Sequence, residues 1–125
     1  MTLTLAGPAF AEGSWSSSMG GVLVGFDSRW WSDGDRDNVG TTISFTGCST
    51  SSSTDSSVTV QLSRYRPVIA DVNEGQKTFT ACMSGGTSSG NWGDKQAADY
   101  RFSIMKINGA TQYVNLSVNN VSVKY

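Results

Sequence analysis

Alternating aspartates form the densest group of metal-binding side chains in this sequence. Asp33, Asp35 and Asp37 stand two residues apart in a turn-rich stretch, and calcium takes several converging carboxylate oxygens. The stretch departs from an EF-hand loop, because Asn38 and Ser44 occupy the positions of its glycine and its bidentate glutamate. Two interpretations therefore stay open: a calcium site of another type with these three aspartates as ligands, or a solvated polar turn. No other cofactor is expected.

Tryptophan close to charged residues is the second chemical signal. Trp30 and Trp31 are adjacent, so in an extended segment they point to opposite sides, one able to join the core and the other exposed. An exposed tryptophan suits a sugar-stacking platform or the hot spot of a protein interface; burial of both is the alternative. Trp92 lies on a glycine-rich turn and is expected to cap the end of the core.

Two arginines flank Tyr65 where a strand is expected to end, and they either grip an acidic partner or form a solvated strand end. Together with the tryptophans they complete the set of candidate binding residues: Trp15, Trp30, Trp31, Trp92, Arg64 and Arg66.

The sequence offers little for catalysis. It contains no histidine, which removes the Ser-His and Cys-His nucleophile pairs and the commonest metal ligand. General acid–base chemistry needs two positioned groups with pKa values pushed apart in a cleft, and no such pair stands out. We therefore expect a protein that is not an enzyme, with a small secreted hydrolase as the last alternative.

Cys48 and Cys82 are the two cysteines, and each follows a strand-like run. We expect a disulfide between them, because a bridge between strands, or from strand to loop, is geometrically easy at such positions; two buried free thiols are the alternative. A zinc site is excluded, since it needs about four Cys or His ligands.

The first residues resemble the end of a secretory leader. Ala9-Phe10-Ala11 matches a signal-peptidase cleavage site, although a basic n-region and most of the hydrophobic stretch are missing. We interpret residues 1–11 as the remnant of a longer signal peptide whose start was assigned too late. The mature chain would then begin near Glu12 and be secreted into an oxidising, extracellular compartment. The alternative is an ordered N-terminal strap that pairs with a sheet edge.

Alternation of apolar and polar residues dominates the rest of the chain. Asn108-Gly109 is the strongest hairpin signal, because a type I′ turn needs positive φ at both positions. The apolar phase changes between Val118 and Val121, so a bulge or a bend between sheets must lie at Asn119-Asn120. The expected strands are 22–26, 42–46, 57–63, 78–81, 100–107, 113–118 and 121–125.

These patterns predict an all-β fold. We expect an antiparallel β-sandwich, Ig-like or jelly-roll-like, of six to eight short strands with one disulfide. Residues 12–20 are expected to be a flexible Ser/Gly linker and residues 21–125 a single sandwich domain, with 49–57 an exposed hairpin loop.

Composition narrows the classes of partner. Charged residues make up 15% of the chain and the formal net charge is −1, with no basic stripe. Nucleic acid is therefore not expected as a partner, since phosphate binding needs clustered lysine and arginine. No stretch approaches the length of a membrane span.

Several of these features together resemble small secreted β-sandwich proteins of actinobacteria. They are the Ala9-Phe10-Ala11 leader, the spacing of the two cysteines, the segment Ser89-Gly90-Asn91-Trp92-Gly93-Asp94 and the ending over 100–125. Within that set the chain is similar, over 12–125 and in overall character, to the adaptor subunit of umbrella-shaped secreted toxin particles. That adaptor joins a repeat-bearing scaffold to a lectin-like subunit, partly through an extended N-terminal segment. The resemblance implies a protein partner and carries over no individual functional residue.

Three functions follow as expectations. The first is a secreted, non-catalytic binding or adaptor domain that acts through protein–protein contacts, in an extracellular antibacterial toxin assembly if the resemblance holds. The second is a carbohydrate-binding, lectin-like module that uses exposed tryptophan with or without calcium. The third is the hydrolase already mentioned.

Overall fold

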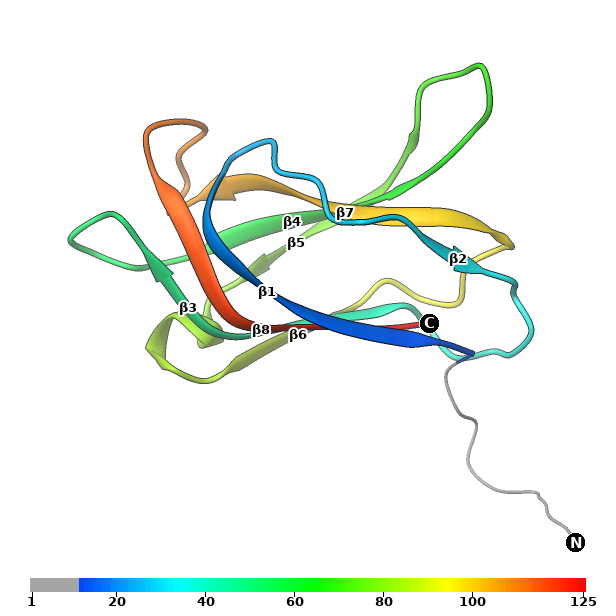
Figure 1. Ribbon diagram of the computed structural model, residues 1–125, viewed down its shortest axis with the longest axis horizontal. Helices are drawn as coiled ribbons and strands as arrows, with labels where there is room; N and C mark the ends of the chain where they lie inside the picture. Colours follow the sequence, from blue (N-terminus) through cyan, green and yellow to red (C-terminus); the bar gives the residue numbers. More distant parts are fainter. Residues whose placement is uncertain (1–11) are drawn as a thin grey trace, which may run out of the picture.

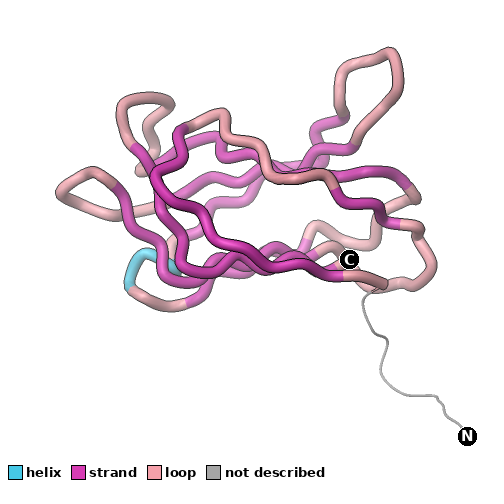
Figure 2. Tube along the Cα trace, in the orientation of Figure 1, coloured by secondary structure: helices cyan, strands magenta, loops and turns pink. Residues whose placement is uncertain are grey.

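Two four-stranded antiparallel sheets pack face to face in the computed structural model, which describes residues 12–125 (Figures 1 and 2). One short 3-10 helix, η1, accompanies the strands. The elements are β1 (Ser14–Leu23), β2 (Trp31–Asp33), β3 (Thr42–Thr50), β4 (Val58–Arg64), β5 (Val72–Phe79), η1 (Ala81–Ser84), β6 (Thr87–Asn91), β7 (Ala98–Ile107) and β8 (Asn115–Lys124).

The first sheet has the strand order β1-β8-β3-β6, and the second has the order β2-β7-β4-β5. Every pairing is antiparallel. The predicted antiparallel sandwich is thus confirmed, with eight strands among the described residues. No helix in this described range is long and apolar enough to cross a membrane.

The core lies between the sheets and follows the predicted alternation. Its fully buried side chains come from the inner faces of the central strands, where period-two patterning turns every second residue inward. The largest of them are Tyr100, Phe45, Phe102, Ile43, Leu62, Ile104, Ile107, Leu116, Val58, Val60, Val118 and Val121.

The phase change predicted in the last strand is confirmed. Val118 and Val121 are both buried while the two asparagines between them are exposed. The neighbouring strand β3 changes phase at the same level, since Phe45 and Cys48 are both buried there. Gly47 makes this change feasible: it has φ 68°, and a Cβ at this position would collide with the side-chain amide of Asn119.

The predicted linker over residues 12–20 is wrong, because most of it belongs to β1. That strand pairs with β8 along its length, with Trp15 opposite Val123, and register shifts occur on either side of Met19. A Ser/Gly-rich composition suggested flexibility, but backbone pairing with β8 and the partly buried Trp15 hold the segment in the sheet.

Other strand boundaries also shift. The predicted strand over 22–26 is interrupted, because β1 ends at Leu23 and the chain turns, with the Phe26 amide donating to the Leu23 carbonyl at 3.0 Å. The strand predicted over 78–81 is the end of β5, which begins earlier and stops at Phe79, and Ala81 begins η1. The loop predicted over 49–57 begins later, because Ser49 and Thr50 still belong to β3. The remaining loop connects the two sheets and does not close a hairpin. Strands β2 and β6 were not predicted.

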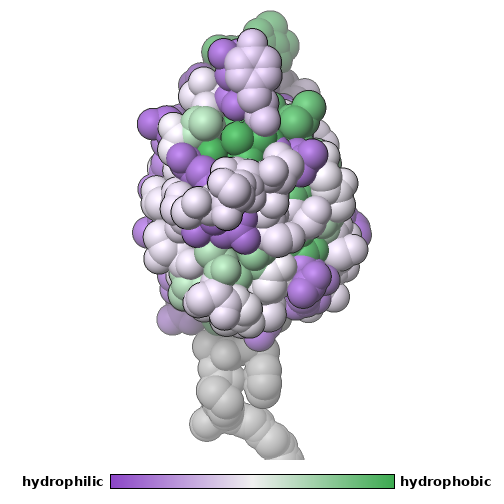
Figure 3. All heavy atoms as spheres, turned by 90° about the vertical axis from the view of Figure 1, so that its left-hand side faces the viewer, coloured by the Kyte–Doolittle hydropathy of each residue, from purple (hydrophilic) through white to green (hydrophobic). Residues whose placement is uncertain are grey.

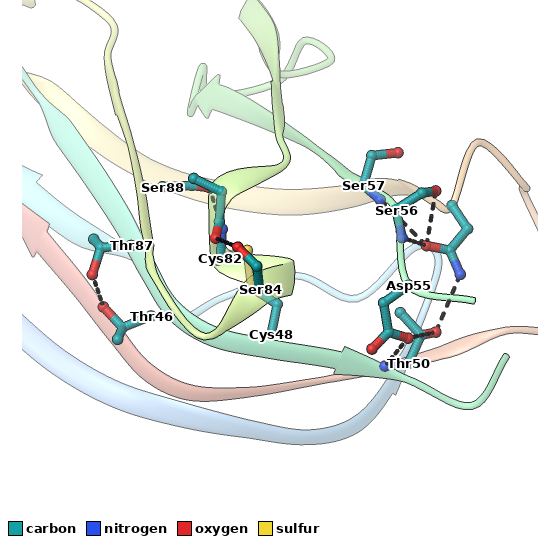
Figure 4. The surroundings of a disulfide bond; sticks show 12 residues. Thr46, Cys48, Thr50, Asp55, Ser56, Ser57, Cys82, Ser84, Thr87 and Ser88 are labelled. Carbon is teal, nitrogen blue, oxygen red and sulfur yellow. Dashed lines mark hydrogen bonds between the residues drawn. A yellow bond between two sulfur atoms is a disulfide. The ribbon is translucent and has the colours of Figure 1, made fainter. Parts of the chain in front are cut away.

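The disulfide between Cys48 and Cys82 is confirmed. It ties η1 to β3 inside the core, where both cysteines are buried (Figure 4). The Cys82 amide donates to Ser88 Oγ at 2.9 Å, which anchors η1 to β6 as well. The turn prediction also holds, since Asn108 and Gly109 have φ values of 54° and 77°. The predicted leader remnant, residues 1–11, lies outside the described residues.

Candidate functional site

Trp30 and Trp31 face opposite sides of the chain, as predicted. Trp31 begins β2 and is 4% exposed, packed between the rings of Tyr100 and Tyr125 at centroid distances of 6.5 and 6.1 Å. Trp30 is 38% exposed on the outer surface. The pair therefore divides into one core residue and one surface residue.

Trp30 belongs to a surface cluster assembled from three separate segments. The guanidinium of Arg101, on β7, lies 4.3 Å from the centre of the Trp30 ring. Tyr65, directly after β4, contacts the same ring edge-on at 5.7 Å. Arg101 is itself held by Asp27 at 3.5 Å and by Asp71 at 3.3 Å. The result is an aromatic–guanidinium surface framed by two carboxylates.

The loop that leaves this cluster, residues 65–71, projects from the body of the sandwich between β4 and β5 (Figure 1). We call it the projecting loop. Val68 at its tip is fully exposed and Ile69 is 61% exposed. The Arg66 guanidinium closes the loop with two hydrogen bonds to the Ala70 carbonyl, at 3.1 and 3.0 Å. Two apolar side chains are thus displayed on a braced loop.

The backbone at the tip is strained. Pro67 and Val68 form the turn, and Val68 has φ 70°, a left-handed conformation that turns normally assign to Gly or Asn. A β-branched residue in this region is an outlier that costs of order 1–3 kcal/mol. Because Val68 is fully exposed, no packing within the domain offsets this cost.

The base of the projecting loop is held by charge. Glu74 accepts hydrogen bonds from Arg64 at 2.9 Å and from Lys95 at 3.0 Å. Burial raises the pKa of Glu74, but the hydrogen bonds from the two cations outweigh it, so the pKa is lowered overall. Arg64 therefore has an internal partner, as does Arg66, and the predicted grip on an acidic partner has no geometric support.

Trp92 is not part of this surface. It is buried at the end of the core as predicted, and its Nε1 donates to the Gly75 carbonyl at 2.9 Å while Lys77 lies 5.5 Å from its ring. Trp31 and Trp92 are thus core residues, which removes two of the candidate binding tryptophans.

A half-open pocket of about 120 Å³ lies on the other side of the segment 27–30. The Trp15 ring lines this pocket and lies nearly parallel to the Phe102 ring, with 6.2 Å between the ring centroids. The Arg29 guanidinium lies 5.2 Å from the centroid of the Trp15 ring. The lining is mainly apolar, with serine hydroxyls and one cation at the margin. It consists of Trp15, Ser17, Ser18, Met19, Phe26, Ser28, Arg29, Phe102 and Val121.

Two of the predicted calcium ligands, Asp33 and Asp37, accept hydrogen bonds from backbone amides of their own loop. Asp33 Oδ1 accepts the Asp35 amide at 2.9 Å, and Asp37 Oδ1 accepts the Val39 amide at 2.9 Å. Within residues 12–125, no three His, Cys, Asp or Glu side chains are arranged to hold a metal ion. The calcium prediction therefore gains no support from the geometry.

Glu12 reaches the same loop and accepts the amides of Gly34 and Arg36. These backbone hydrogen bonds lower the pKa of Glu12, whereas burial raises the pKa of Asp33. The two carboxyls shift in opposite directions, yet neither lines the pocket. They act as caps of the 33–36 loop.

The end of the sandwich opposite the projecting loop also exposes apolar side chains. It carries the turn after β1 and the loop before β8, and apolar atoms gather toward its top (Figure 3). Tyr113 on that loop is 89% exposed and has φ 70°, and Leu23 is also exposed. Unlike Val68, Tyr113 carries a polar hydroxyl.

Sequence reasoning missed Val68, Ile69 and Arg101. An apolar pair placed directly after Pro67 in a loop was an available signal for the first two. Nothing local marked Arg101, whose neighbours come from distant segments. Comparisons with protein-family models, with curated proteins and with solved structures found no match for this chain.

Proposed function

We propose that this protein is a secreted, non-catalytic adaptor domain that binds a partner protein through the projecting loop and the Trp30 surface. The observation that carries the proposal is Val68, which is held fully exposed in a strained backbone conformation beside the exposed Ile69. This apolar tip costs stability and is left exposed by residues 12–125, and a pocket on a partner protein would account for it.

The construction of the loop supports a binding role. Its tip is closed by Arg66 and its base is held by Glu74, so the apolar side chains are presented in one geometry. A braced loop loses little conformational freedom on binding, and this raises affinity.

The surface beside the loop has the composition of a protein interface. Tryptophan, tyrosine and arginine are the residue types enriched at interface hot spots, and Trp30, Tyr65 and Arg101 lie together here. The carboxylates of Asp27 and Asp71 provide the polar surround that such a centre usually has.

The proposed setting is an extracellular assembly. A disulfide in a domain of this size is typical of oxidising compartments, and Ala9-Phe10-Ala11 matches a leader cleavage site. The resemblance to toxin-particle adaptors supplies the partner class: a protein subunit of a secreted antibacterial particle.

Carbohydrate binding has less support than protein binding. Trp31 and Trp92 are buried, and Arg101 lies over the ring of Trp30. A hydrolase has less support still, because the only titratable side chain that lines the pocket, within 12–125, is Arg29.

The test is affinity capture from culture supernatant of the producing organism, with three baits: the wild type, Val68→Ser/Ile69→Ser and Tyr113→Ser. The third is a matched control, since Tyr113 is also largely exposed, has the same φ as Val68 and lies at the other end. We expect one partner that the wild type and the control retain and that the double variant loses. Retention by all three baits, or a supernatant glycan eluted in place of a protein, contradicts the proposal.

A further inference from the structure

The free edge of β1 differs from the other sheet edges. Among residues 12–125, four strands lie at sheet edges: β1 and β6 in the first sheet, β2 and β5 in the second. Strands β2 and β6 have three and five residues, and β5 carries Glu74 and Lys77. Strand β1 has ten residues and no charged side chain. Proteins commonly shorten, charge or bulge their edges to prevent pairing. The irregularities of β1 lie on either side of Met19, so the first half of the strand has none of these protections.

At alternate residues of β1, the backbone N–H and C=O groups point away from the neighbouring strand β8. Gly13 and Tyr125 exchange both backbone hydrogen bonds, at 2.8 and 2.9 Å. In an antiparallel pair such residues alternate with ones whose N–H and C=O face outward. Ser14 and Ser16 are therefore the outward-facing residues in the first half of β1, where the register is continuous.

The pocket opens beside this edge. Ser17, Ser18 and Met19 of β1 contribute to its lining. Its volume of about 120 Å³ is close to that of an apolar cavity of roughly 150 Å³ that accepts benzene. The pocket therefore has room for one aliphatic or aromatic side chain.

One charged group at the pocket lacks an ion-pair partner within residues 12–125. Arg29 forms no ion pair, although its guanidinium lies over Trp15. The Arg29 guanidinium therefore offers its N–H donors and its positive charge to a carboxylate.

We propose that the edge of β1 binds an extended segment of a protein partner as an added strand. The segment places one apolar side chain in the pocket and a neighbouring carboxylate at Arg29. Main-chain hydrogen bonds to an edge give affinity, and a pocket for alternate side chains gives specificity. This surface is distinct from the projecting loop, so it goes beyond the proposed function and provides the second contact that an adaptor needs.

The probe is an acetylated, amidated octapeptide of alternating threonine and leucine with one central aspartate, titrated calorimetrically. Saturable binding is expected, and replacing the leucines by serine abolishes it. Arg29→Glu weakens binding of the aspartate peptide about tenfold. A peptide with lysine in place of the aspartate restores binding to this variant. Ser17→Phe fills the pocket and removes the leucine preference. Arg36→Glu, at an exposed arginine of another loop, is the matched control and binds normally.

Absence of saturable binding overturns the inference, as does equal weakening by Arg29→Glu and Arg36→Glu. So does tighter binding of a free fatty acid than of the peptide, because the pocket would then be a lipid site. The Val68→Ser/Ile69→Ser variant binds the peptide like the wild type. If the wild-type protein captures its partner through the projecting loop but does not bind the peptide, this inference alone is refuted. If the wild-type protein binds the peptide but the capture experiment fails, only the proposed function is refuted.

Discussion

The guanidinium of Arg101 lies 4.3 Å from the centre of the Trp30 ring, and this contact determines how the exposed tryptophan is presented. The two residues are far apart in the sequence and meet because β2 pairs with β7. Asp27 and Asp71 hold the guanidinium in place. The stack fixes a surface tryptophan in one orientation without burying it.

Arg101→Ala is expected to release Trp30. The cation–π contact and two partly exposed ion pairs together contribute about 1 kcal/mol, so the free energy of unfolding should fall by about that amount. Acrylamide quenching of tryptophan fluorescence should increase in the folded variant. Arg101→Lys is the control, since it keeps the charge but loses the planar stack. Unchanged quenching in Arg101→Ala would show that Trp30 is held by other contacts.

Val68→Gly is expected to stabilise the protein by about 1 kcal/mol. Glycine adopts φ 70° without the penalty that a β-branched residue has, which outweighs its greater entropy in the unfolded chain. Urea denaturation measures the difference. Val68→Ala keeps a Cβ and should gain less. A lower stability for Val68→Gly would contradict the strain argument.

Tyr100→Phe tests the alkaline stability. The Tyr100 hydroxyl donates to the Gln96 carbonyl at 2.7 Å, and burial raises the pKa of Tyr100 to about 12. The unfolded side chain ionises near its ordinary pKa of 10.0, so the unfolded state loses its proton first. Wild-type stability should be at its full value below about pH 10 and should fall between about pH 10 and 12.

The variant lacks this ionisation. Its free energy of unfolding should be about 1 kcal/mol lower than the wild type at neutral pH, through loss of one hydrogen bond. The gap should narrow as the pH rises above 10, when followed by denaturant titration. A gap that stays constant would show that Tyr100 does not contribute to the alkaline transition.

Replacing both cysteines by alanine tests the bridge. Cys48 and Cys82 are 34 residues apart, and the chain-entropy model assigns about 3–4 kcal/mol to a loop of this length. Guanidinium denaturation should show a loss of that size. The wild type under reducing conditions is the control and should match the double variant. A loss well below 2 kcal/mol would place the stabilisation in the surrounding core.

Local patterns predicted the features that depend on near neighbours. Asn108-Gly109 forms its turn because both positive φ values are a property of the two residues themselves. Ile43 and Phe45 are buried together because alternation is a property of any strand. The bend at Asn119 followed from a change of phase, although its counterpart at Gly47 went unrecognised.

Features that depend on distant segments were not predictable in this way. Composition marked residues 12–20 as flexible, yet a neighbouring strand more than 90 residues later turns them into β1, with Ser17 paired to Val121. The Asp33 loop had the spacing of calcium ligands, but its oxygens are satisfied by amides of the same loop. Spacing alone does not reveal which groups an oxygen faces.

The sequence by itself determined an all-β sandwich, the pairing of its two cysteines and the division of Trp30 and Trp31 between opposite sides, because each follows from the geometry of a short extended segment or from the number of cysteines. Only the tertiary structure decided that Trp31 is the buried member, that Arg101 and Tyr65 join Trp30, and that β1 has a free edge beside a pocket. These are consequences of sheet order and register, which bring together residues that no local pattern connects.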